Sequence, residues 1–465
     1  MLNKSVFSFV LAVTLILTGW PAAAQTQKAQ ASPDNVPALL VKANEAYIAK
    51  DYMTFRTTLE RLHKLRPYNG QYMYQLVIAH ALLDEKDQAY TMMLTMQKQG
   101  LSYDFSVPES TKNIRGTEVF DYVNDLMIMA GKPLGESEPV VVLPDDVRFP
   151  ESITWDESRQ KFLIGSISDG SIHTLDTGGQ VEELLKANNE NGLWAVMDIL
   201  VDQARNRLWV SSAAIPVFSG YNPADKGRSA LLEFNLETLE LIRTYPVPVD
   251  QNPHVLGSMV LGPNGDIYIA DRALPIVFKK AAGEEKIKAV LASRDMVSLR
   301  GIAMQPDGEI MYLADREMGI MVADFKGRRA MKLGIPETLN LGGIDGIYLW
   351  NNHLVIIQNG NSPERVMRLE LDETHTKVIA IRPLAVAQIE FDSPGFGTIR
   401  GEDLIYFANR QLNNTEGKVK PVTILRTPLD SSKDLAEPDM VEFLKKRSEA
   451  NEARLKNREQ DEVEK

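Results

Sequence analysis

Short runs of alternating apolar and polar residues, separated by tight turns, dominate the chain from about residue 139 onward. Residues 149–176 read FPESITWDESRQKFLIGSISDGSIHTLD. The pattern predicts an apolar strand, a polar turn, a second strand over 161–166, an Asp-Gly turn and a third strand over 171–175. An Asp-Gly turn between alternating apolar runs is the strongest short-range sign of a β-hairpin. The segment therefore predicts a β-meander.

The same pattern recurs five more times downstream. Aligned on the residue just before each first strand, the six units start at Glu151, Met197, Gly257, Arg300, Asp345 and Gly397. The intervals of about 43 to 60 residues lie in the range of propeller blades. The sequence therefore predicts a mainly β fold, a six-bladed β-propeller over residues 139–428.

A region of helical period, residues 37–135, precedes the strands. Polar breaks divide it into helical hairpins, and Pro67 follows the first of them. The packing positions Phe55 and Ala89 correspond at an interval of 34 residues, so the region resembles tetratricopeptide repeats. Such an array implies a groove that holds a peptide or protein partner. The alternative is a small all-α cap that only packs on the propeller.

The two ends of the chain have other compositions. Met1 to Ala24 combines a basic start, a short apolar run and small residues, as in a secretory signal cleaved near Ala24. This predicts a secreted or periplasmic protein with no membrane span after signal cleavage, because no later segment is long and apolar enough. Residues 25–36 form a polar leader, and residues 436–465 a charged tail that cannot bury a core.

Charge and cysteine content narrow the choice of partners. The chain has 51 basic and 63 acidic residues, a formal net charge of −12, and no cysteine. An acidic chain argues against nucleic acid as a partner, because phosphate backbones need a basic surface. No disulfide can form.

Candidate chemistry gathers where the blades converge. Residues just before the innermost strands of a closed propeller meet at one mouth of its channel. This column contains the carboxylates Glu151 and Asp345 together with Arg300, and the next positions include Asp198 and Ser258. An unpaired charge at a narrow mouth is costly, so these carboxylates must face a metal, a basic side chain or water.

The segments PESITWD and GIDG, with the blade rhythm of the whole propeller, resemble the senescence-marker-protein/gluconolactonase/luciferin-regenerating-enzyme family, which includes regucalcin-like lactonases. The resemblance implies a divalent cation, calcium or zinc, held in the channel by Glu151 and Asp345. Gly257 and Arg300 stand where the family has asparagine ligands. Two alternatives remain: a remodelled metal site, or Arg300 as the countercharge in place of the metal.

The resemblance also implies hydrolysis of a small-molecule lactone or ester, in which a cation polarises the carbonyl and a base activates water. His254, just ahead of a column position, is the general-base candidate, and Asp198 is the other. The alternative for His254 is a loop histidine bonded to backbone. The insertion 213–229 brings Phe218 and Tyr221 as lining for a ligand pocket, or forms a plain surface loop.

One tripeptide recurs at the end of the second strand in several blades: Ala-Asp-Arg at 270–272 and 314–316, and Ala-Asn-Arg at 408–410. A slot repeated in this way indicates hydrogen bonds and ion pairs between blades. Two functions remain open: a lactone or ester hydrolase, and a non-catalytic scaffold that binds a ligand or protein with propeller and helices together.

Overall fold

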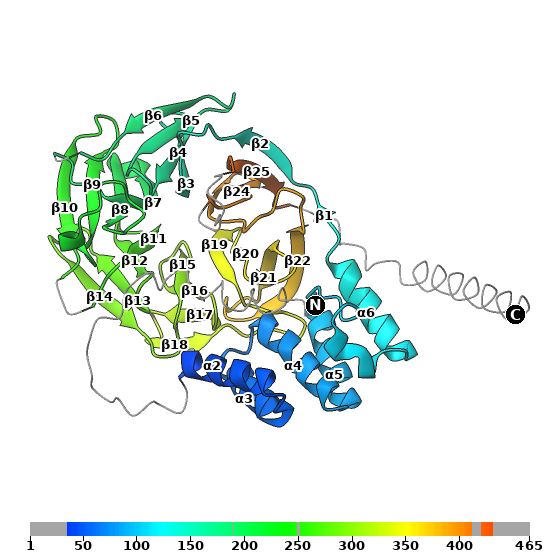
Figure 1. Ribbon diagram of the computed structural model, residues 1–465. Helices are drawn as coiled ribbons and strands as arrows, with labels where there is room; N and C mark the ends of the chain where they lie inside the picture. Colours follow the sequence, from blue (N-terminus) through cyan, green and yellow to red (C-terminus); the bar gives the residue numbers. More distant parts are fainter. Residues whose placement is uncertain (1–34, 189, 249–251, 412–419, 431–465) are drawn as a thin grey trace, which may run out of the picture.

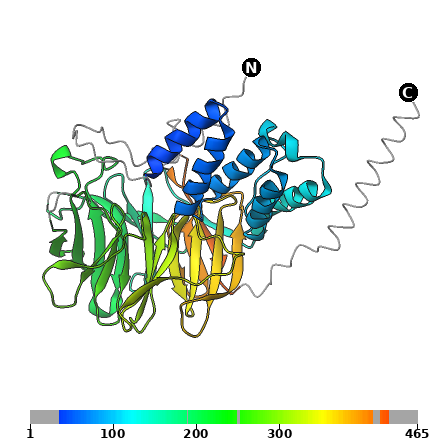
Figure 2. The same cartoon turned by 90° about the horizontal axis from the view of Figure 1, so that it is seen from below.

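The computed structural model describes residues 35–188, 190–248, 252–411 and 420–430. Six β-sheets form a ring, and a helical domain sits on one face of it (Figures 1 and 2). The six-bladed propeller and the preceding helical region are therefore confirmed. The predicted signal sequence and charged tail lie outside the described residues, so export stays a prediction. Within the described ranges, no helix has the length and apolarity needed to cross a membrane.

Each blade is an antiparallel sheet whose first strand lies innermost, beside the first strands of its neighbours. Blade one consists of β3 (Pro150–Asp156), β4 (Lys161–Ser166), β5 (Ile172–Leu175) and β6 (Val181–Leu185). Blade two consists of β7 (Ala195–Asp202), β8 (Arg207–Ala213), β9 (Ser229–Asn235) and β10 (Leu241–Pro246). Blade three consists of β11 (Leu256–Leu261), β12 (Ile267–Asp271), β13 (Ile276–Lys280) and β14 (Ile287–Ala292). Blade four consists of β15 (Leu299–Met304), β16 (Ile310–Asp315), β17 (Gly319–Asp324) and β18 (Arg329–Lys332).

The last two blades incorporate strands from the region between the two domains. Blade five consists of β19 (Ile344–Trp350), β20 (His353–Gln358), β21 (Arg365–Leu371) and β22 (Val378–Val386), and β1 (Leu134–Gly135) pairs with β22. Blade six consists of β23 (Gly397–Arg400), β24 (Asp403–Phe407) and β25 (Thr423–Pro428), and its outer strand is β2 (Glu138–Val142). A strand from before blade one therefore completes blade six. Because blade six contains strands from both ends of the propeller, it holds the ring closed.

The helical domain is a set of paired helices with polar caps at their starts. Its elements are α2 (Val36–Ile48), α3 (Tyr52–Leu65), α4 (Gly70–Leu82), α5 (Lys86–Lys98), the 3₁₀ turn η2 (Glu109–Ile114) and α6 (Glu118–Ala130). Asp51 accepts a hydrogen bond from the backbone amide of Thr54 in the first turn of α3, and Asn69 accepts one from that of Tyr72 in the first turn of α4, as helix N-caps do. Phe55 and Ala89, the equivalent packing positions, are both buried.

The middle helix of this domain, α4, is buried on nearly all sides. Tyr74 of α4 stacks on Tyr103 and Phe105, ring centroids 5.1 Å away in each case, so the segment after α5 covers one of its faces. A helix that is apolar all round is a core helix. This arrangement resembles the cap alternative, and a peptide partner for the helical domain stays a prediction.

The helical domain packs on loops of blades four and five. Arg365 is only 5% exposed and lies at this interface. It donates to the Gln358 side chain at 2.8 Å, to the backbone carbonyl of Gln99 at 3.0 Å and to that of Asn340 at 3.2 Å. A buried guanidinium is tolerated when its donors are satisfied, so Arg365 joins the end of α5 to the propeller through hydrogen bonds.

Candidate functional site

The aligned column residues lie inside the innermost strands and not before them as predicted. Glu151, Gly257, Arg300 and Asp345 are the second residues of their strands, Met197 is the third of β7 and Gly397 is the first of β23. In β3, β7, β15 and β19 the pairing register shifts at this point, and the residues at the shift are Glu151, Met197, Arg300 and Asp345. A β-bulge leaves one residue out of the ladder and re-aims its side chain. The repeated bulge therefore turns one side chain in each of these four blades out of the regular alternation at the channel mouth.

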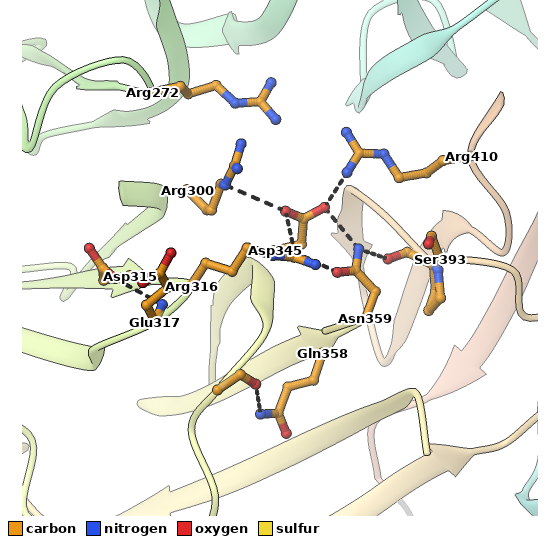
Figure 3. Close-up of polar contacts among 12 residues, drawn as sticks. Arg272, Arg300, Asp315, Arg316, Glu317, Asp345, Gln358, Asn359, Ser393 and Arg410 are labelled. Atoms are coloured by element: carbon orange, nitrogen blue, oxygen red, sulfur yellow. Dashed lines mark hydrogen bonds and ion pairs between the residues drawn. The ribbon is translucent and has the colours of Figure 1, made fainter. Parts of the chain in front are cut away.

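The tripeptide repeated at 270–272, 314–316 and 408–410 supplies positively charged side chains at the channel mouth. Its middle residue is structural: Asp271 and Asp315 are buried and accept hydrogen bonds from the backbone amides of the loops around them. Its arginine points toward the column carboxylates. We call Arg272, Arg316 and Arg410, together with Arg300 from the column, the arginine cluster; Figure 3 shows its four side chains around Asp345.

Guanidinium groups bind both column carboxylates, and Figure 3 shows those around Asp345. Glu151 accepts from Arg410 at 2.5 Å with Oε1 and from Arg272 at 3.1 Å with Oε2. Asp345 accepts from Arg316 at 3.3 Å with Oδ1 and from Arg410 at 2.7 Å with Oδ2. Each of these bonds joins two different blades, so the predicted ion pairs between blades are present in the tripeptide slot.

Asn359, which directly follows β20, completes the network around Asp345. Its amide donates to Asp345 Oδ2 at 3.0 Å and its oxygen accepts from Arg316 at 2.6 Å. Phe396 lies between two members of the cluster, its ring centroid 5.0 Å from the guanidinium carbon of Arg272 and 5.6 Å from that of Arg410. Such cation–π contacts hold guanidiniums flat against a ring.

Arg300 is different from the other three arginines. Its Nε lies 4.0 Å from Asp345 Oδ1, beyond hydrogen-bond distance, and this buried Nε has no hydrogen-bond partner within the described part of the chain. Burial, with the nearby charge of Arg272, lowers the pKa of Arg300 to about 10. Arg410, Arg272 and Arg316 make the direct contacts with the carboxylates, and Arg300 as the countercharge in place of a metal stays a prediction.

Gly257 makes room for one of these arginines. A Cβ at this position would lie 2.4 Å from Cδ of Arg272, inside van der Waals contact. Any larger side chain at position 257 would displace the stem of Arg272. The family resemblance expects an asparagine ligand at position 257. The glycine found there instead leaves the space that the Arg272 side chain occupies.

The pKa values of the carboxylates follow from these neighbours. Burial alone would raise the pKa of Asp345, but the guanidiniums of Arg410, Arg316 and Arg300 outweigh burial and hold it well below the usual value. Glu151 is buried in the same way, and Arg410 and Arg272 hold its pKa below the usual value. Both carboxylates are thus ionised at neutral pH, and four guanidiniums against two carboxylates leave two net positive charges.

A divalent cation does not fit this donor set. Calcium needs six to eight oxygen ligands, but all four oxygens of Glu151 and Asp345 already accept hydrogen bonds from guanidinium or amide groups. The fixed positive charges of the cluster would also repel a cation. In the described ranges, no group of three or more His, Cys, Asp or Glu side chains is arranged to hold a metal ion.

Asp198 and Ser258, the predicted residues one position along the column, connect neighbouring blades. Asp198 accepts from the backbone amide of Met259 at 2.7 Å, and Ser258 from that of Ile302 at 3.4 Å. Burial raises the pKa of Asp198 to about 7, although its side chain is only partly buried from solvent. Asp198 is therefore the column group that changes charge near neutral pH.

His254 has the surroundings of a structural histidine. It is 4% exposed, its Nδ1 lies 2.6 Å from Asp271 Oδ2, and its ring packs edge-on against Phe278. These contacts are those of a histidine that holds a loop in place through hydrogen bonds. A catalytic role for His254 stays a prediction.

The insertion of blade two joins the end of β8 to the start of β9. The end of β8 pairs with the start of β7, which lies at the channel mouth, so the insertion lies on the same face of the propeller. Phe218 is buried and packs in one apolar cluster with Met197, the column residue of blade two, and with Ile167. Tyr221 is half-buried at the edge of this cluster. The insertion therefore supports the wall of blade two at the mouth, and direct contact of Phe218 or Tyr221 with a ligand stays a prediction.

The chain is similar to known proteins only through their solved structures. No family model and no curated protein sequence matches the chain. A luciferin-regenerating enzyme matches with 14% identity and a TM-score of 0.45, covering 64% of this chain and 95% of that one. A calcium-binding regucalcin from Agrobacterium tumefaciens matches with 14% identity and a TM-score of 0.45, covering 62% and 94%.

A third match has a different chemistry. A PQQ-bound aldose sugar dehydrogenase from Streptomyces coelicolor matches with 13% identity and a TM-score of 0.43, covering 64% of this chain and all of that one. The expected likeness to luciferin-regenerating and regucalcin-like propellers is thus found. At these identities and TM-scores the matches carry no argument about chemistry, which rests on the arginine cluster and its two carboxylates.

Proposed function

We propose that this propeller binds a small anionic molecule at the channel mouth, through a carboxylate or phosphate group held by the arginine cluster. The observation that carries the proposal is the excess of two guanidiniums over carboxylates in a buried site of an acidic chain. A buried cation without an anionic partner is costly, and guanidiniums bind carboxylate and phosphate through paired charge-assisted hydrogen bonds.

Arg300 and Arg272 are the residues that would hold the anion. Their guanidiniums lie near each other on one side of Asp345 (Figure 3), close enough for the charge of Arg272 to affect the pKa of Arg300. No carboxylate of the described chain lies within hydrogen-bond distance of Arg300. The bound group would therefore satisfy donors that the protein itself leaves unused.

The first experiment measures binding of inorganic phosphate and of succinate by calorimetry at low ionic strength, where charge effects are least screened. We expect binding of at least one of them, and an affinity about 10- to 100-fold weaker in Arg300→Met, as loss of hydrogen bonds to a charged group predicts. Arg328→Met is the matched control, because Arg328 is exposed in the β17–β18 turn of the same blade on the opposite face.

The two probes separate the two sources of negative charge. Preference for phosphate would assign a phosphate-bearing ligand, and preference for succinate a carboxylic acid. Equal affinity of wild type and Arg300→Met for both probes would contradict the proposal.

Asp198 favours a second candidate function, the hydrolysis of a lactone or ester. A general base works best when its pKa is near the working pH, and burial places that of Asp198 at about 7. In this reaction Asp198 would accept a proton from water, and the arginine cluster would stabilise the negative charge that develops on the substrate oxygen.

The second candidate is tested by the pH profile of hydrolysis over a panel of lactones and aryl esters. We expect kcat/KM to rise about tenfold per pH unit up to about pH 7 and then level off. Asp198→Asn should lower kcat about 100-fold or more, while Arg328→Met should leave the profile unchanged. Hydrolysis that is insensitive to Asp198→Asn would reject this role, and no hydrolysis of any substrate would leave the binding function alone.

A further inference from the structure

The helical domain meets the propeller directly beside the arginine cluster. Arg66 of the helical domain forms an ion pair with Glu317, which follows Arg316 in the sequence. The side-chain oxygen of Gln99 accepts from the amide of Asn340 at 2.9 Å. Glu317 lies in the β16–β17 loop with Arg316, and Asn340 in the β18–β19 loop, next to the strand that carries Asp345.

Two hydrogen-bond steps and one peptide bond lead from the second contact to the mouth. The Gln358 amide donates to the backbone carbonyl of Asn340 at 3.0 Å and to that of Gly342 at 2.6 Å. The next residue is Asn359, which holds Asp345 and Arg316. The helical domain is thus two side chains away from the residue that orients Arg316.

The backbones of the two domains pack closely at this interface. A Cβ on Gly342 would lie 2.1 Å from the backbone oxygen of Tyr68, which belongs to the α3–α4 turn. Gly343 and Gly360 approach each other so closely that a Cβ on either would overlap the other backbone, and a Cβ on Gly360 would lie 3.1 Å from Arg316. Displacement of the helical domain would therefore move backbone that touches Arg316.

We propose that docking of the helical domain positions Arg316 and Asn359, so that domain docking and anion binding at the mouth stabilise each other. This inference rests on the proposed anion-binding function. Gln99 and Asn340 are positioning residues, since they act on the site through Gln358 and Asn359. Coupling between two sites is reciprocal for binding equilibria, so the bound anion must also tighten the domain interface.

The first arm of the test measures phosphate and succinate affinity in Arg66→Ala/Gln99→Ala, which removes both contacts without touching the mouth. We expect affinity to fall about 5-fold or more, within the usual range of coupling energies. Arg66→Lys/Gln99→Glu is the conservative control, because it keeps the positive charge and the acceptor oxygen. We expect it to bind as wild type does.

The second arm uses the unmodified protein and needs no variant to fold. Amide hydrogen exchange at residues 99–102 and in the 340–343 loop should slow when the bound probe saturates the mouth. No change in exchange, or unchanged affinity in the alanine variant, would overturn the coupling while leaving the anion site intact. Absence of binding to the wild-type protein would instead overturn the proposed function and the coupling with it.

Discussion

Replacement of Asp345 by asparagine should lower the free energy of unfolding by about 3–5 kcal/mol, the usual cost of removing one partner from a buried ion pair. Asp345 is fully buried and faces Arg410, Arg316 and Arg300, with Asn359 as a further donor. An uncharged amide would leave four guanidiniums facing the single charge of Glu151. Their mutual repulsion adds to the lost hydrogen bonds.

Urea unfolding at pH 7 measures this effect, with Asp84→Asn as control because the Asp84 side chain is 69% exposed. The control should stay within about 0.5 kcal/mol of the wild type, as surface substitutions do. Phosphate or succinate should stabilise the variant more than the wild type, since an anion can replace the missing charge. A loss below about 1 kcal/mol would contradict this account of the cluster.

Asp198→Asn should remove a large part of the pH dependence of stability between about pH 4 and pH 7. The folded-state pKa of Asp198 is raised to about 7 by burial, whereas an unfolded aspartate has a pKa near 3.9. The stability that its protonated form contributes is full below about pH 4 and is lost as pH rises toward 7. The amplitude is on the order of 4 kcal/mol, at 1.36 kcal/mol per unit of pKa difference.

The measurement is urea unfolding at half-unit steps from pH 4 to pH 8. Asparagine resembles the protonated carboxyl, so the variant should lack the decline due to Asp198 and be more stable than the wild type above pH 7. Glu364, whose pKa burial also raises to about 7, is present in both proteins, so their difference isolates Asp198. Parallel profiles for the two proteins would reject the raised pKa.

Asp345 and Glu151 change the pH dependence of stability in the direction opposite to that of Asp198, because their pKa values are lowered in the folded state and not raised. Their folded-state pKa values are depressed by the guanidiniums, so the stability they contribute is present above the unfolded pKa of about 4 and is lost as pH falls below it. The wild-type protein should therefore be most stable in mildly acidic solution.

The blades could be predicted from the sequence because hairpin chemistry is local. The second strand of blade one is predicted over 161–166 and observed as Lys161–Ser166, and the third differs by one residue at its start. Turn residues and alternation act over a few positions, so no tertiary information is needed to place them. The closing strand β2 was not foreseen as part of blade six, because its partner β25 lies almost 300 residues away in the chain.

The site could be predicted only in outline. Equivalent positions in a closed ring must converge, which is enough to bring Glu151 and Asp345 together. The bulge that re-aims them is a mismatch in pairing between two strands, and the alternation of one strand does not reveal it. The sequence therefore predicts the right column residues in these blades, but the strands begin one or two residues before them and not after them.

The arginines of the repeated tripeptide were visible as a repeat, but their importance at the mouth was missed. Arg410 binds Glu151 across 259 positions of sequence, and nothing local to either residue indicates the pairing. The available signal was the fixed position of arginine after a buried acidic or amide residue at the end of a second strand. No sequence pattern indicates where the helical domain docks, because its contacts with the propeller are made by single polar side chains on irregular loops.

The position of β1 and β2 also fixes the order in which the molecule can be completed during synthesis. The helical domain emerges first, and domains that emerge first generally fold first. The strands that follow it pair only with β22 and β25, the outer strand of blade five and the last strand of the described chain. During synthesis β1 can pair only after β22 has been translated, and β2 only after β25, so the ring can close only once the last strand of blade six has been made.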